Sequence, residues 1–483
     1  MSVPRRRTKI VCTLGPATSS REAIRALIEA GMDVARLNFS HGSHEDHRAR
    51  IGMVREEAQR YGRIIPILQD LQGPKIRIGD VAGGGVLLSK GQALTLTAEP
   101  LAESTAERVY VSYEPLAQEV VAGGRILVDD GRIEFEVTEV VGGDVRVSVV
   151  VGGPLRSKKG VNLPMTRSSR PSLTEKDLTD LAFGLEQEVE MVALSFVRSG
   201  DDVRDLCERI EATGRETAVV AKVEKPEAVA AFEDVLASAN AIMVARGDLG
   251  IEIPMQEVPV VQKRLIRRCL QAAVPVITAT QMLESMMDNP RPTRAETSDV
   301  ANAVFDGSDA VMLSGETAAG KYPVEAVQAM DEIIRTAEAA RRQLGGQEAA
   351  SEVHHAASAV TQAISFTAVR LASEVGARAI CCLTHSGATA RAVARHRPDV
   401  PIYAFTDDPA VVGRTAVVWG SEGIAIPFQE HTDDGIRAVH RELIARGFAT
   451  VGELIVVTAG LPLPAKGLTN MVHVSTVGEE RWE

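Results

Sequence analysis

The sequence has few aromatic residues, no excess of positive charge and no long apolar run. Aromatic residues make up 4% of the 483 positions, which is too few for a surface that stacks against single-stranded nucleic acid. The net charge of −12 argues against a broad face for polyanions. No run reaches about 18 apolar residues, so a membrane-spanning helix is not expected. We therefore expect neither nucleic-acid nor membrane partners, and a few placed cations must bind any anionic substrate.

Cysteine is also scarce, and its placement is informative. The five cysteines form no CxxC pair and lie in apolar helix or strand patterns, which indicates reduced core residues. The N-terminal segment MSVPRRRTKIVCTLG is basic but lacks the apolar stretch of a signal peptide. These features predict a cytoplasmic protein.

Short apolar segments alternate with helix-periodic segments along most of the chain. The predicted strands of the first series are Lys9–Gly15, Val34–Phe39, Ile64–Asp70, Met191–Val197, Ala218–Glu224, Ala241–Gly247, Pro275–Thr280 and Ala310–Gly315. Eight such βα units are typical of a (β/α)₈ TIM barrel. The pattern thus predicts an α/β catalytic domain formed by residues 1–71 and 164–342.

Two further domains are predicted from changes in this pattern. Residues 72–163 switch to Gly/Val-rich alternation with no long helical period, which indicates an inserted all-β domain acting as a lid over the barrel mouth. A Gly/Ala/Glu-rich segment follows the last barrel helix, and a second βα series comes after it. We expect a C-terminal α/β domain at residues 345–483.

The active site of a TIM barrel lies at the C-terminal ends of its strands. There the sequence places carboxylates, cations, hydroxyls and a glycine turn: Arg36, Asn38, Ser40, Asp70, Ser195, Lys222, Glu224, Arg246, Gly247, Asp248, Thr280, Gln281, Ser314 and Glu316. Such a set suits a hard metal ion and a phosphorylated substrate.

Three of these residues predict metal-assisted phosphoryl chemistry. Lys222 and Glu224 are two positions apart on one strand and therefore face the same way. Glu224 and Asp248 lie at the tips of adjacent strands, where they can hold Mg²⁺. Lys222 then supplies a point charge to a transferring phosphoryl group, and Arg36 can bind phosphate oxygens as a fork. The alternative is a buried structural ion-pair network without catalytic use.

Longer segments carry a family resemblance. These are KIVCTLGPAT, ARLNFSHG, KKGVNLP, TEKDLTDLAFG, IMVARGDLGIEIP, TATQMLESM, PTRAETSDVANAV and MLSGETAAGKYPVEAV. They cover nearly all of the first 330 residues, and together they resemble the pyruvate kinase family. The resemblance implies phosphoryl transfer from phosphoenolpyruvate to ADP, giving pyruvate and ATP. It also implies Mg²⁺ or Mn²⁺ as cofactor and a homotetrameric assembly.

The resemblance also implies residue roles. Arg36 binds the phosphoryl group, Lys222 stabilises it, and Glu224 and Asp248 hold the metal. The expected substrate-binding residues are Arg36, Ser195, Gly247, Asp248 and Thr280. The expected nucleotide-binding residues are Asn38, Phe39, Ser40, His41, Arg77 and Lys159. Thr280 or Ser314 lies on the path of the proton that converts the enolate to pyruvate.

One departure from the family pattern concerns monovalent cations. Many members have Thr and Glu where this chain has Leu71 and Lys75, and those members resemble enzymes activated by K⁺. The family position for K⁺ corresponds to Asn38, Ser40, Asp70 and Leu71. Here the Lys75 ammonium can supply the single positive charge, which predicts activity without added K⁺. The alternative is a solvated Lys75 at the lid hinge.

The segment LTHSGATARAV in the C-terminal domain resembles the family's effector-phosphate loop. It presents Thr384, Ser386 and Thr389 at the start of a predicted helix, where backbone N–H groups favour an anion. The later loop AGLPLPAKG lacks the Arg and Trp of fructose-bisphosphate-responsive members, although Lys466 is present. We expect a phosphorylated allosteric effector; an ordinary helix cap is the alternative.

Two apparent motifs are set aside. The segment 315–322 nearly matches a P-loop, but Tyr322 occupies the position of the metal-binding hydroxyl. His41, His44 and His47 open a polar helix rather than a metal site.

Two other functions remain open from the sequence. One is a metal-dependent lyase or mutase of pyruvate enolates on the same barrel. The other is a non-catalytic metabolite sensor.

Overall fold

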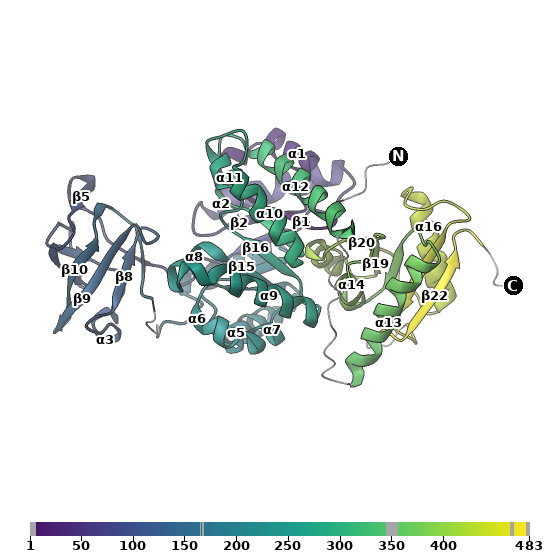
Figure 1. Cartoon of the computed structure of the whole chain (residues 1–483). Helices are drawn as coiled ribbons and strands as arrows, with labels where there is room; N and C mark the ends of the chain where they lie inside the picture. The colour runs from purple at the N-terminus through teal and green to yellow at the C-terminus, as the bar shows by residue number, and fades with distance from the viewer. Residues whose placement is uncertain (1–5, 165, 167–168, 344–355, 464–467, 480–483) are drawn as a thin grey trace.

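The structure is a computed structural model that describes residues 6–164, 166, 169–343, 356–463 and 468–479. Figure 1 shows an all-β part at one end, a barrel surrounded by helices in the middle, and a second α/β part at the other end. The predicted boundary near residue 345 and Lys466 lie outside the described residues. Within the described ranges, no helix combines the length and apolar character needed to cross a bilayer.

A closed barrel of parallel strands forms the centre, which confirms the predicted fold. Its strands are β1 (Lys9–Leu14), β2 (Val34–Asn38), β3 (Ile67–Asp70), β13 (Met191–Leu194), β14 (Ala218–Val223), β15 (Ala241–Ala245), β16 (Val276–Ala279) and β17 (Ala310–Leu313). They close in the order β1-β17-β16-β15-β14-β13-β3-β2. The predicted strands were too long. The fourth one ends at Leu194 because Phe196 has a φ of 57°, which a strand does not allow.

Helices cover the outside of this barrel. They are α1 (Arg21–Ala30), α2 (His44–Arg60), α4 (Glu175–Glu186), α5 (Gly200–Glu211), α6 (Pro226–Ala230), α7 (Phe232–Ser238), α8 (Arg246–Glu252), α9 (Val258–Ala272), α10 (Arg294–Asp306), α11 (Gly315–Ala318) and α12 (Pro323–Gln343). Helix α10 illustrates their local signals, since it begins at a capping box of Thr293 and Glu296 and ends at Gly307 with a φ of 101°.

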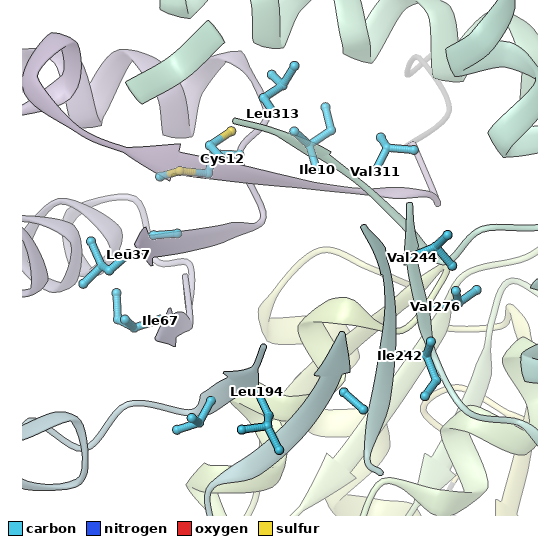
Figure 2. Close-up of a cluster of buried hydrophobic side chains, with 14 of the residues drawn as sticks. Ile10, Cys12, Leu37, Ile67, Leu194, Ile242, Val244, Val276, Val311 and Leu313 are labelled. Carbon is cyan, nitrogen blue, oxygen red and sulfur yellow. The ribbon is translucent and has the colours of Figure 1, made fainter. Parts of the chain in front are cut away.

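Alternate residues of each barrel strand enter different cores. On β1, Ile10 and Cys12 pack in the outer core against the helices, whereas Val11 lies in the core inside the barrel. Figure 2 shows labelled members of the outer core on several barrel strands, among them Ile10, Leu37 and Ile242. Because side chains alternate with a period of two, this parity decides which residues of each strand point into the barrel.

The lid is an antiparallel-rich β structure with its own core. A seven-stranded sheet has the order β4 (Ile76–Arg77), β12 (Gly160–Asn162), β8 (Arg125–Val128), β9 (Ile133–Val141), β10 (Asp144–Val151), β6 (Ala93–Thr97) and β7 (Arg108–Tyr110). A second sheet pairs β5 (Gly85–Leu88) with β11 (Gly153–Arg156), and α3 (Leu116–Glu119) is a single turn. The chain leaves the barrel at Gly73, which has a φ of 70° and lies against the Phe196 ring. A side chain at this position would collide with that ring.

The C-terminal part is a five-stranded sheet with helices. The strand order is β20 (Ser421–Ala425), β19 (Ile402–Thr406), β18 (Ile380–Leu383), β21 (Leu454–Ala459) and the antiparallel β22 (Met471–Thr476). Its helices are α13 (Ala356–Glu374), α14 (Ala388–Ala394), α15 (Pro409–Arg414) and α16 (Thr432–Ala445). The adjacent Cys381 and Cys382 belong to different cores on the two faces of this sheet. All five cysteines are free.

Asp309 joins the base of the barrel to this C-terminal part. Its Oδ1 accepts hydrogen bonds from Arg397 Nη1 at 2.9 Å and from the Trp419 backbone N–H at 3.2 Å. Its Oδ2 accepts a hydrogen bond from the Val276 N–H at 3.0 Å. Both partners of the ion pair are buried, so Asp309 satisfies groups from two parts of the chain at once.

We predict that Asp309→Ala lowers the free energy of unfolding by about 3–5 kcal/mol, because it leaves the Arg397 charge buried without its counter-ion. Urea unfolding measures this change. The control is Asp205→Ala, which removes an exposed pair with Arg209 and should cost at most about 1 kcal/mol. Equal losses in the two variants would contradict the role given to Asp309.

Candidate active site

Because side chains alternate along each barrel strand, polar residues form one layer at the C-terminal mouth of the barrel. Val34, Leu68 and Val220 point into the barrel core, and two positions further along their strands come Arg36, Asp70 and Lys222. The same alternation places Thr13, Ser195 and Ser314 in this layer. Residues far apart in the sequence therefore form one polar layer above an apolar barrel interior.

Asp70 is the centre of this layer. Its Oδ2 accepts hydrogen bonds from Arg36 Nε at 2.7 Å and lies 2.6 Å from Arg36 Nη2. Its Oδ1 lies 3.2 Å from Lys222 Nζ. Arg36 Nη1 donates to Thr13 Oγ1 at 2.8 Å. Burial alone would raise the pKa of Asp70, but Lys222 and Arg36 outweigh that effect and lower it, so the carboxylate stays charged.

Lys222 is held by three oxygen atoms. Its ammonium donates to Ser195 Oγ at 2.7 Å and lies 2.7 Å from Glu224 Oε1, in addition to its contact with Asp70. Burial alone would lower the pKa of Lys222, yet the charges of Asp70 and Glu224 raise it above its usual value. Lys222 is therefore a permanent buried cation and not a proton donor near neutral pH.

Glu224 and Asp248 are the carboxylates that could hold a metal ion. The Asp248 carboxylate is close enough to affect the pKa of both Lys222 and Glu224. Glu224 Oε2 accepts from the Phe196 N–H at 3.0 Å, while its Oε1 lies 2.7 Å from Lys222 Nζ. Among the described residues no group of three or more His, Cys, Asp or Glu gathers for a metal. Two carboxylates nevertheless fit Mg²⁺, which completes its shell with water and substrate oxygens.

A strained turn faces Asp248 across the neighbouring strand end. Thr280 and Gln281 have φ values of 69° and 54°, which is unusual for a β-branched residue such as Thr and marks a constrained site. Thr280 Oγ1 accepts from the Gly247 N–H at 2.8 Å, and Arg246 Nη2 donates to the Thr280 carbonyl at 2.7 Å. The loops after β15 and β16 are thus locked together.

Ser314 lies beyond the last barrel strand with its hydroxyl available. Its Oγ is buried and has no partner in the described part of the chain. Its backbone N–H donates to Glu316 Oε2 at 2.7 Å, and Glu316 Oε1 accepts from the Leu283 N–H at 3.1 Å. The backbone around Ser314 is therefore fixed while its hydroxyl is unused.

A cavity of about 390 Å³ opens between the lid and the barrel mouth. This volume suits a nucleotide-sized ligand. The predicted residues that line it are His41, Lys75, Arg77, Lys159 and Asp248. Lys158 of the lid also lines it, as do three cationic residues that the prediction missed, namely Arg170, Arg198 and Lys225. Asp129 and Asp130 line it as well, and Lys159 Nζ lies 2.8 Å from Asp129 Oδ1, but cations outnumber carboxylates in the cavity although the chain as a whole is acidic.

Three predicted nucleotide contacts do not line this cavity. Phe39 is buried and stacks on His47 with a centroid distance of 4.1 Å. Asn38 Oδ1 accepts from the Ser40 N–H at 3.1 Å, which shapes the turn before His41. This loop contributes to the cavity wall through His41 alone among the predicted positions Asn38–His41.

Lys75 lies beside the same loop. Burial lowers the pKa of His41, and the charges of Lys75 and Arg77 lower it further, so the Lys75 ammonium is near His41. Lys75 is exposed, whereas Leu71 is buried. The Asp70 carboxylate is ion-paired with Arg36 and Lys222.

The predicted effector residues line a second cavity of about 370 Å³, in the C-terminal part. Thr384 Oγ1 accepts from the Gly387 N–H at 3.0 Å, and the buried Thr389 hydroxyl is hydrogen bonded to Thr469 Oγ1 at 2.8 Å. Asp407 and Asp408 also line this cavity, so its wall carries acidic as well as hydroxyl groups.

Sequence reasoning missed several residues of the barrel mouth. Thr13, Phe196 and Lys225 contact Arg36, Glu224 and Glu252 respectively. Thr13 could have been found from parity, since it follows Val11 by two positions. The others depend on loop conformations that have no signal in the periodicity.

A family model for the pyruvate kinase barrel domain matches residues 5–327, and one for the pyruvate kinase alpha/beta domain matches residues 362–475. Pyruvate kinase from Mycobacterium tuberculosis is 46% identical over 475 residues, covering 98% of this chain and 99% of that protein. The Corynebacterium glutamicum enzyme is also 46% identical, covering 98% of both chains. The Geobacillus stearothermophilus enzyme is 45% identical, covering 98% of this chain and 81% of its own length.

Proposed function

The chain belongs to the pyruvate kinase family, and we propose that its barrel mouth transfers the phosphoryl group of phosphoenolpyruvate to ADP, giving pyruvate and ATP. The observation that carries this proposal is the buried cluster of Asp70, Arg36, Lys222 and Glu224 beside a cationic cavity under the lid. The cluster supplies fixed charge for the phosphoryl group, and the cavity supplies a place for the nucleotide.

Arg36 and Lys222 act on the transferring phosphoryl group. The bond between the enol oxygen and phosphorus breaks while an oxygen of the ADP β-phosphate bonds to phosphorus. Negative charge on the equatorial oxygens is stabilised by cations held in place beforehand. Asp70 fixes both cations, so little reorganisation is needed during the reaction.

Members of this family use a divalent metal ion, and we assign Mg²⁺ or Mn²⁺ to Glu224 and Asp248. When bound, the ion polarises substrate oxygens and neutralises charge. The Gly247 N–H, Asp248 and Thr280 surround the position of the substrate carboxylate, and Ser195 orients Lys222 through its hydroxyl. The strained Thr280 turn keeps this arrangement rigid.

Protonation of the enolate completes the reaction. Ser314 and Thr280 are the hydroxyl groups of this site that we place on the proton path. The Ser314 hydroxyl has no partner among the described residues, whereas Thr280 Oγ1 already accepts from Gly247. A free hydroxyl can relay a proton from water, because it both donates and accepts.

The nucleotide phosphates lie against the lid in this proposal. Arg77 and Lys159 line the cavity from the lid side and His41 from the barrel side; Asn38, Phe39 and Ser40 shape the loop that carries His41. A lyase or mutase of pyruvate enolates has no use for this cationic lid. A sensor has no use for the Lys222 cluster.

We also propose a regulatory and cellular setting. The cavity around Thr384, Ser386 and Thr389 binds a phosphorylated effector, and subunits associate as a homotetramer through which that signal passes. The enzyme works in the cytoplasm, where glycolysis takes place. The family resemblance supports each of these proposals.

Lys222→Met should reduce pyruvate formation from phosphoenolpyruvate and ADP with Mg²⁺ by at least about 10²-fold, since one preorganised charge is lost. The expected effect is on kcat, with a smaller change in the KM for ADP. A coupled assay measures both. Parent turnover that survives in the variant would contradict the role of Lys222, and an inactive parent would contradict the proposed function.

A second prediction concerns K⁺. We propose that Lys75 supplies the positive charge that K⁺ supplies in other members, so turnover should change less than about twofold between K⁺ and tetramethylammonium at fixed ionic strength. Lys75→Glu, with Leu71→Thr, should create K⁺ dependence. Many-fold activation of the parent by K⁺ would refute this interpretation of Lys75.

A further inference from the structure

Helix α8 carries functional residues at both ends. Asp248 lies in its first turn, and Glu252 is its last residue. Residues four positions apart share one face of a helix, and four residues rise about 6 Å. This short helix therefore connects Asp248, the proposed metal ligand, to the residues that contact Glu252.

Glu252 contacts the lid and the barrel with the same oxygen atom. Its Oε1 accepts from Asn162 Nδ2 at 3.1 Å and from Lys225 Nζ at 2.7 Å. Asn162 is the last residue of β12, and Lys225 directly follows Glu224. The Glu252 side chain is 3% exposed and the Lys225 side chain 15% exposed, so water competes weakly for these contacts.

The position of β12 decides where the lid cations lie. Strand β12 pairs with β4, with Gly160 opposite Arg77, and Lys159 directly precedes β12. Fixing Asn162 therefore fixes the strand pair that carries Arg77. Lys225 and Asn162 also line the cavity under the lid, and the Lys225 ammonium lies 5.7 Å from the Phe196 ring centroid.

We propose that Glu252 is a positioning residue for the nucleotide. This inference rests on the proposed phosphoryl transfer and adds a bridge, formed by Asn162, Glu252 and Lys225, that the resemblance did not assign. The bridge holds β12 at a fixed position relative to Asp248. Arg77 and Lys159 therefore face the phosphates of ADP next to the metal carboxylates. Lys225 balances the buried charge of Glu252 while it holds the β14 end in the same bridge.

The competing explanation is a buried ion pair that only stabilises the fold. It predicts a lower melting temperature in Glu252 variants and unchanged affinities for both substrates. The positioning role predicts a selective effect, because phosphoenolpyruvate is held by Arg36, Gly247 and Thr280, whereas ADP depends on the lid.

The test compares Glu252→Gln, Asn162→Ala and their double variant with the parent. Each single variant should raise the KM for ADP about fivefold, as expected for the loss of one hydrogen bond or its charge, while the KM for phosphoenolpyruvate changes less than about twofold. The double variant should be no worse than Glu252→Gln, since both changes break one bridge. Glu252→Asp, which keeps the charge, should recover part of the affinity.

Arg209→Met is the matched control, because it removes an exposed ion pair with Asp205 on α5. It should leave both KM values unchanged. Additive effects of the two substitutions, equal changes in both KM values, or a stability loss alone would overturn the bridge. An inactive parent would instead defeat the proposed function. If Glu252→Gln does not fold, Asn162→Ala still decides the question, because it removes the lid side of the bridge only.

Discussion

The buried carboxylate of Asp70 is the interaction on which the site depends. It is ion-paired with both Arg36 and Lys222 in a place that water reaches poorly, and Glu224 supplies the second negative charge. Removing one partner of a buried ion pair typically costs about 3–5 kcal/mol. Without this anion Arg36 would lose its carboxylate partner, and Lys222 would keep only Glu224. The barrel closes β2 against β3, and this pairing brings Arg36 to Asp70.

The same strand end also directs the chain into the lid. Asp70 ends β3, and the chain leaves the barrel three residues later at Gly73. The chain returns through β12, whose last residue, Asn162, meets Glu252. The cluster around Asp70 and the two ends of the lid are therefore close together in space. Phosphoryl transfer requires the phosphates of ADP to lie beside this cluster, and this arrangement brings them there.

Much of the fold and the site could be predicted from the sequence. Apolar runs identified all eight barrel strands, and the rule that TIM-barrel sites lie at strand ends selected Arg36, Lys222, Glu224 and Asp248. The role of Asp70 as counter-ion could not be predicted, because periodicity gives the face of each strand but not the register between strands. The left-handed Thr280 and the lid contact of Glu252 were also out of reach. Both depend on loops whose conformation is set by residues distant in the sequence.

The turnover of Asp70→Asn beside Asp70→Glu measures how far the site depends on this carboxylate. Asp70→Asn should lose at least about 10²-fold in kcat, because Arg36 loses its carboxylate partner and Lys222 keeps only Glu224. Asp70→Glu keeps the charge and should retain measurably more activity. Near-parental kcat in Asp70→Asn, with the protein folded, would show that Arg36 and Lys222 act without this carboxylate and would contradict its central role in the site.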